Sequence, residues 1–96
     1  MADPHVRWIV HFEQRLAERK IRWELARRVY VGADLHVRDA VTGRFIAVKR
    51  VVHLGKERDL AIVYIEDKDD VLLITVLVLK RGQLQRRLAS GRWLRR

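Results

Sequence analysis

Cysteine is absent from this chain of 96 residues, and proline occurs once. Without cysteine, the chain has neither disulfide bonds nor thiolate ligands for a metal ion. The longest apolar run, Val71 to Leu79, is interrupted by Thr75 and is too short to span a membrane. The first residues also lack the basic segment and following apolar stretch of a signal peptide. We therefore expect a cytoplasmic protein that makes no contact with a membrane.

Acidic residues are absent from the last fifth of the chain. The formal net charge is +9, and residues 1–76 hold 14 Lys and Arg against 12 Asp and Glu. Residues 77–96 hold seven basic residues and no acid. Arginine accounts for 16 of the 21 basic residues, which suits bidentate contact with phosphate and equally suits a genome that favours arginine codons. The basic end predicts contact with nucleic acid, an acidic protein or an anionic surface.

Apolar residues make up 49% of the chain, which is enough for the core of one domain. Their spacing predicts a short leading strand at 6–10, helices at 11–20 and 21–31, and strands at 35–41, 44–54, 60–66 and 71–79. Short turns between the strands favour an antiparallel meander over alternating βαβ units. The predicted fold class is α+β, with two N-terminal helices packed on an antiparallel sheet of three to five strands and a basic C-terminal helix or arm.

Residues 80–96 have two possible structures. Leu84 and Leu88 favour a short helix over residues 83–90, whereas the basic end at 92–96 also fits a loose arm. We assign residues 1–79 to the α+β body and residues 80–96 to a basic extension of the same domain. The strand at 71–79 is the most apolar and is expected at the centre of the sheet. At an exposed edge it would instead favour pairing of two chains in a homodimer.

His11 is the best candidate for a general acid or base, because an imidazole exchanges protons near neutral pH. In a helix it lies one turn from Arg15, which would hold a phosphate or stabilise developing negative charge. The alternative is a histidine that packs or bonds to backbone at a helix start, beside a solvated arginine.

Three strand residues complete the predicted catalytic group. Lys49 and Arg50 are adjacent in an apolar strand, so their side chains must point to opposite faces of the sheet. Either of them reaches a face shared with the first helix, or the pair decorates an edge strand. Thr75 is the polar residue within an apolar strand, and its hydroxyl needs a hydrogen-bond partner. That partner is either His11 or a nearby carbonyl.

A second group of residues is predicted to bind nucleic acid. Trp93 is flanked by arginines, in a pattern that resembles those that stack on exposed bases. The predicted nucleic-acid-binding residues are Arg19, Arg81, Arg86, Arg87, Arg92 and Trp93. No metal site is expected, because His36 and His53 lie in separate strands without Asp or Glu at matching spacing.

Over residues 6–78 the chain resembles domain-of-unknown-function family 4258. The resemblance is carried by the motifs His11-x-x-x-Arg15, Glu18-Arg19-x-Ile21, Thr42-Gly43-Arg44, a strand with Tyr64, and the strand Val71-Leu72-Leu73-Ile74-Thr75-Val76. That family is grouped with the RelE/ParE-like toxins, a superfamily of small α+β ribonucleases and related toxins. The resemblance implies an α+β toxin-like fold for residues 1–79.

Two functions are compatible with these patterns. In the first, a toxin-like ribonuclease cuts RNA without a metal ion or other cofactor. His11 exchanges the proton while Arg15 and Lys49 or Arg50 hold the scissile phosphate, and an acidic antitoxin-like protein binds the basic chain. RNA cleavage should then be lost in His11→Ala and in Arg15→Ala. In the second, the chain is a non-catalytic module that binds nucleic acid or protein through its basic C-terminal tail.

Overall fold

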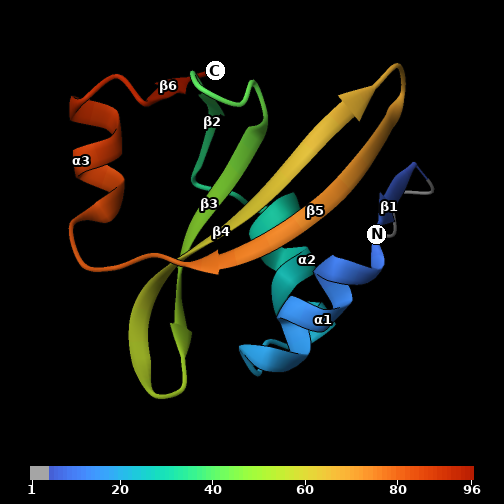
Figure 1. Ribbon diagram of the computed structural model, residues 1–96. Coiled ribbons are helices and arrows are strands. Elements are labelled where there is room, and N and C mark those ends of the chain that lie inside the picture. Colours follow the sequence, from blue (N-terminus) through green and yellow to red (C-terminus); the bar gives the residue numbers. More distant parts are fainter. Residues whose placement is uncertain (1–4) are drawn as a thin grey trace.

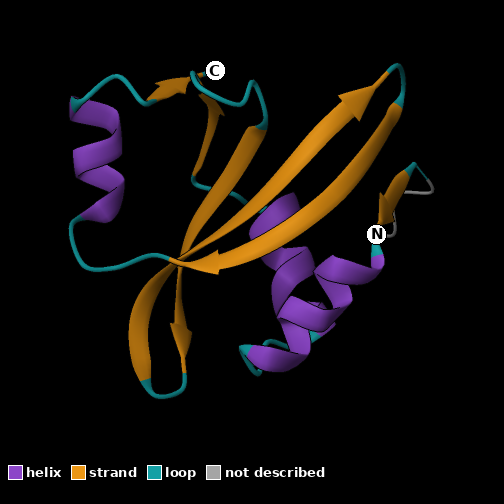
Figure 2. Cartoon of the chain, viewed as in Figure 1, coloured by secondary structure: helices purple, strands orange, loops and turns teal. Residues whose placement is uncertain are grey.

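The computed structural model describes residues 5–96, and in these residues it contains one six-stranded sheet and three helices (Figures 1 and 2). The elements in chain order are β1 (Val6–Trp8), α1 (Val10–Glu18), α2 (Trp23–Val31), β2 (Leu35–Asp39), β3 (Phe45–His53), β4 (Lys56–Asp67), β5 (Asp70–Val78), α3 (Gln83–Ala89) and β6 (Trp93–Arg95). The strand order across the sheet is β1-β5-β4-β3-β2-β6. β1 runs parallel to β5, and every other pair of neighbours is antiparallel.

The predicted fold class is wrong about the sheet and about the N-terminal helices. The sheet is mixed and has six strands, where an antiparallel sheet of three to five was expected, and only α1 lies near the N-terminus. The reason lies at the two edges of the sheet, where β1 and β6 have three residues each. Segments this short carry too little alternation to reveal a partner, since their pairing depends on the rest of the fold. β1 pairs with β5 in parallel. β6, which lies in the segment expected to be a C-terminal helix or arm, pairs with β2.

The sheet separates two hydrophobic clusters. The face covered by α1 and α2 carries the larger cluster, which includes Phe12 and Val29 from the helices and Tyr64 from β4. The opposite face faces α3 and carries a smaller cluster around Val37 and Trp93. Figure 1 shows α3 on the other side of the sheet from α1 and α2. β3, β4 and β5 therefore contribute apolar side chains to both clusters, which explains their continuous apolar runs.

The helices are attached to the sheet by apolar residues at helical spacing. Phe12 is fully buried in α1, and Leu16 one turn later packs against the same cluster. In α2, Ala26 and Val29 are fully buried three residues apart. No helix in residues 5–96 has the length and apolar character needed to cross a membrane.

The end of β5 leaves part of β4 with a single neighbour. β5 ends at Val78, whose partner in β4 is Leu60, whereas β4 begins at Lys56. The chain then turns away toward α3, and Gly82 takes the positive φ of 76° just before that helix. Consequently the end of the β3–β4 hairpin extends beyond β5, as Figure 1 shows. The candidate site lies beside the edge of β4 that β5 leaves without a neighbour.

Candidate functional site

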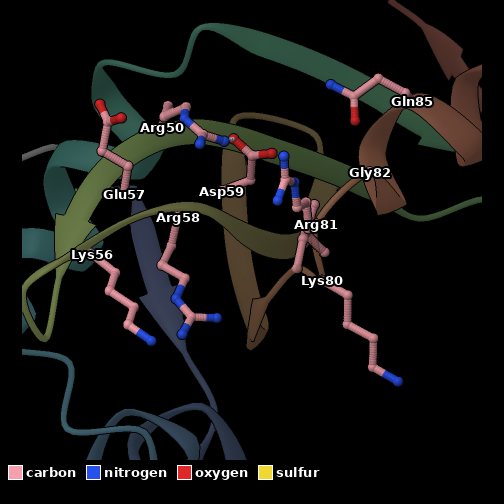
Figure 3. A pocket seen from close by; sticks show the side chains of 10 residues that line it. Arg50, Lys56, Glu57, Arg58, Asp59, Lys80, Arg81, Gly82 and Gln85 are labelled. Carbon is pink, nitrogen blue, oxygen red and sulfur yellow. Dashed lines mark hydrogen bonds and ion pairs between the residues drawn. The ribbon is translucent and has the colours of Figure 1, made fainter.

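A cavity of about 790 Å³ opens beside the free edge of β4, where β5 leaves the sheet (Figure 3). We call it the basic groove, because five of its ten lining residues are Lys or Arg and two are acidic. The side chains of Lys56, Arg58 and Lys80 extend to the same side in Figure 3. The lining residues are Arg50, Lys56, Glu57, Arg58, Asp59, Leu79, Lys80, Arg81, Gly82 and Gln85.

Most of the cations in the basic groove have no acidic partner among residues 5–96. Arg50 is the exception, because its guanidinium lies 3.3 Å from the carboxylate of Asp59, its cross-strand neighbour. Within the part of the chain that the structure describes, no ion pair joins Lys56, Arg58 or Lys80 to a carboxylate. The same holds for Arg81. Unpaired cations gathered in a concave surface attract anions from solution.

Two smaller cavities extend the basic groove in both directions. One, of about 430 Å³, shares Lys80 and continues along α3. The other, of about 350 Å³, shares Arg58 and continues to the end of α1. We call the whole surface the basic band. Its cations are Arg19, Lys20, Arg50, Lys56, Arg58, Lys80, Arg81, Arg86 and Arg87, and its acids are Glu18, Glu57 and Asp59.

His11 and Arg15 are in contact, but they lie outside these three cavities. The Arg15 Nε donates to the His11 Nε2 across 3.3 Å, and its terminal nitrogen lies 2.8 Å from the Glu18 carboxylate. The His11 side chain is exposed on α1. The one-turn spacing thus places an imidazole beside a guanidinium.

The remaining predicted catalytic residues lie elsewhere. Lys49 pairs with Leu60 of the cluster under α1 and α2, and its ammonium lies 3.4 Å from Asp34. Arg50 points to the opposite face, as strand alternation requires, and lines the basic groove. Thr75 is the cross-strand partner of Val63, which packs in the α3-side cluster, so Thr75 lies on the face away from His11. The structure does not bring the five residues together into one centre.

The predicted nucleic-acid-binding residues divide into two groups. Arg19, Arg81, Arg86 and Arg87 line the basic band. Arg92 and Trp93 do not, because both bind the carboxylate of Asp39, at 3.0 and 3.3 Å. Trp93 is only 4% exposed, and the Arg87 guanidinium lies 5.9 Å from its ring centre. This ring packs in the core and offers no free face to a base.

Lys56, Arg58 and Lys80 are the groove residues that sequence reasoning missed. Residues 55–58 lie between the strands expected at 44–54 and 60–66, whereas in the structure β4 already begins at Lys56. The available signal was the spacing of Lys56 and Arg58, two residues apart, which places two cations on one face of a strand. Lys80 lines the same groove as Lys56 and Arg58 because of where β5 ends. The local sequence does not reveal that position.

A polar cluster on the α2 face anchors the end of the chain. The Tyr64 hydroxyl lies 2.8 Å from the His36 Nδ1 and 3.2 Å from the Arg96 guanidinium, which also pairs with Glu66 at 2.9 Å. Burial lowers the pKa of His36, and the charge of Arg96 lowers it further. Burial likewise raises the pKa of Tyr64, against the effect of Arg96. These contacts tie β2 and β4 to the residue after β6, so we assign the cluster a structural role.

Metal chemistry has no candidate ligand set in residues 5–96, where no three His, Asp or Glu side chains gather suitably for an ion. The observed arrangement is a band of cations, and His53 and Glu18 line its cavity at the α1 end. Unpaired cations on a concave surface can attract a polyanion. No protein family model, curated protein or solved structure matches this chain.

Proposed function

We propose that this protein is a binding module that contacts the phosphate backbone of nucleic acid through the basic band. The observation that carries the proposal is the basic groove, in which no carboxylate of residues 5–96 pairs with Lys56, Arg58, Lys80 or Arg81. The contact surface differs from the tail first expected. It combines α3 with the free edge of β4, whereas Arg92 and Trp93 stabilise the fold.

The shape and composition of the basic band favour backbone contact over recognition of bases. Lys and Arg that approach phosphates release condensed counterions, and this release supplies most of the affinity of sequence-independent binding. Proteins that bind single strands usually add aromatic side chains on which bases stack. No Phe, Tyr or Trp lines the three cavities of the band. The phosphates, rather than the bases, are therefore the expected contact.

Removing two groove cations should weaken binding. In the double variant Lys56→Gln/Arg58→Gln we expect the affinity for a 20-base-pair duplex to fall at least about tenfold, because two phosphate contacts are lost. The slope of log affinity against log salt concentration should fall by about 2 for the same reason. Fluorescence anisotropy titrations at several salt concentrations measure both quantities.

The matched control removes the same two kinds of charge outside the basic band. Arg44→Gln/Lys68→Gln changes one exposed arginine and one exposed lysine that line none of the three cavities. This variant should keep nearly the wild-type affinity and slope. Equal losses in the two double variants would show that net charge alone drives binding, and no binding at low salt would refute the proposal.

The ribonuclease remains a second candidate, supported by the 3.3 Å contact between His11 and Arg15. It predicts that RNA cleavage is lost in His11→Ala and in Arg15→Ala while circular dichroism remains unchanged. Activity undiminished in both variants removes the pair from any mechanism. An acidic antitoxin-like partner would use the same cations as nucleic acid, so the two ligands should compete for the basic band.

A further inference from the structure

The turn between β3 and β4 places a leucine in an unfavourable backbone conformation. The two strands are joined by Leu54 and Gly55, whose φ angles are 51° and 76°. Positive φ at both central residues is typical of a type I′ turn, in which Asn-Gly is the preferred sequence. A bulky residue rarely occupies this region, because its Cβ crowds the backbone. Such strain at an exposed turn suggests a functional reason for the leucine.

This leucine forms an apolar tip on a well-anchored hairpin. Leu54 is 71% exposed, and Val52 is 67% exposed. Below the tip, Val51 and His53 are buried, and the His53 Nε2 lies 2.9 Å from the backbone carbonyl of Arg19. The hairpin therefore presents aliphatic side chains to solvent from a base that is fixed against α1. Figure 1 shows it extending beyond the rest of the sheet.

Cations surround the apolar tip. Leu54 lines the same cavity as Arg19, Lys20 and Arg58 at the α1 end of the basic band. Lys56, two residues after Leu54, lines the basic groove. A polyanion held in the band would thus pass beside the tip of the hairpin.

We propose, on the basis of the proposed function, that the hairpin inserts Leu54 between adjacent base pairs of duplex DNA while Lys56 and Arg58 hold the flanking phosphates. Aliphatic wedges of this kind unstack a base step from the minor groove and bend the duplex. Duplex RNA is a poorer ligand, because it is read mostly by shape and by its 2′-hydroxyls. Single strands would require the aromatic platforms that the band lacks. DNA also offers flexible pyrimidine–purine steps where a wedge enters at low cost.

The variant Leu54→Asn separates the wedge from the phosphate contacts. Asparagine accepts the left-handed conformation, so the melting temperature should rise by about 4–8 °C. The affinity for a 20-base-pair DNA with a central TA step should nevertheless fall about tenfold. Energy transfer between dyes at the two DNA ends, which reports bending, should be lost. The salt slope should stay at the wild-type value, because the variant keeps every cation.

Val41→Asn is the matched control, since Val41 is 73% exposed in the turn before β3, at the opposite end of that strand. It should alter neither affinity nor bending. Wild-type affinity and bending in Leu54→Asn would overturn the wedge and leave phosphate binding intact. Tighter binding of wild type to duplex RNA, to single-stranded DNA or to phosphatidylserine vesicles would also overturn it. Failure of wild type to bind any nucleic acid at low salt would refute both proposals.

Discussion

Replacing Trp93 by alanine should lower the free energy of unfolding by about 3–5 kcal/mol, as removal of a buried tryptophan does in other cores. Trp93 is 4% exposed and belongs to the α3-side cluster with Val37 and Leu79. Its Nε1 also donates to Asp39 across 3.3 Å. The substitution therefore leaves a cavity between the sheet and α3 and removes a buried hydrogen bond. Urea unfolding followed by circular dichroism measures the change.

Leu94→Ala is the control, because Leu94 is the next residue of β6 and is 41% exposed. We expect it to cost less than about 1 kcal/mol. If Trp93→Ala lowered the free energy of unfolding as little as Leu94→Ala, β6 would be a dispensable arm. A loose arm is one of the two structures expected for residues 80–96. The same reasoning makes deletion of residues 80–96 a poor test of binding, since it removes α3, β6 and Trp93 together.

The sequence allowed the position of most strands to be predicted, because alternation over a long segment is a strong signal. The strand expected at 44–54 is β3 at Phe45–His53. The pairing of the two edge strands, β1 and β6, was not predictable in the same way. Arg92, Trp93 and Arg95 read as a cationic tail because no local pattern reveals that Asp39 lies opposite Trp93. The partner that converts an arginine into a structural residue is 53 residues away in the chain.

The candidate site was predicted in part for the same reason. Strand alternation gave opposite faces for Lys49 and Arg50, and the helical spacing placed His11 beside Arg15. Nothing in the sequence relates α1 to the far face of β5, so Thr75 was assigned to a site that it faces away from. The groove itself arises from the difference in length between β4 and β5, which is a property of the assembled sheet.

Asp39 is the carboxylate that pairs with Arg92 of the C-terminal extension. It accepts hydrogen bonds from the amides of Val41 and Thr42 as well as from Arg92 and Trp93. One carboxylate thus fixes the β2–β3 turn and β6 together. Arg92 is thus paired with an acid, whereas no ion pair within residues 5–96 involves Arg86 or Arg87 of α3. Asp39 holds Arg92 and Glu66 holds Arg96, so two acids fix the arginines on either side of β6.

Acid should weaken the fold through Asp39. Burial raises the pKa of this carboxyl, but the hydrogen bonds from Arg92, from the amides of Thr42 and Val41 and from Trp93 lower it to about 2, against 3.8 ordinarily. A carboxyl with a lowered pKa in the folded state stabilises the fold above its ordinary pKa, and this contribution is lost as the pH falls toward 2. The shift corresponds to about 2 kcal/mol at neutral pH.

The Asp39→Asn variant should reveal this contribution as a difference that depends on pH. The variant should be less stable than wild type at pH 5, and this difference in the free energy of unfolding should be about 2 kcal/mol larger at pH 5 than at pH 2. The difference shrinks at low pH because wild type itself loses the charged carboxylate there. Urea unfolding at both pH values gives the two differences. The control is Asp69→Asn, which changes an exposed carboxyl in the β4–β5 turn, and the difference for Asp39→Asn should exceed the one for this control. A constant difference for Asp39→Asn would mean that the charge of Asp39 does not hold β6, and that packing of Trp93 alone keeps the C-terminal strand in the sheet.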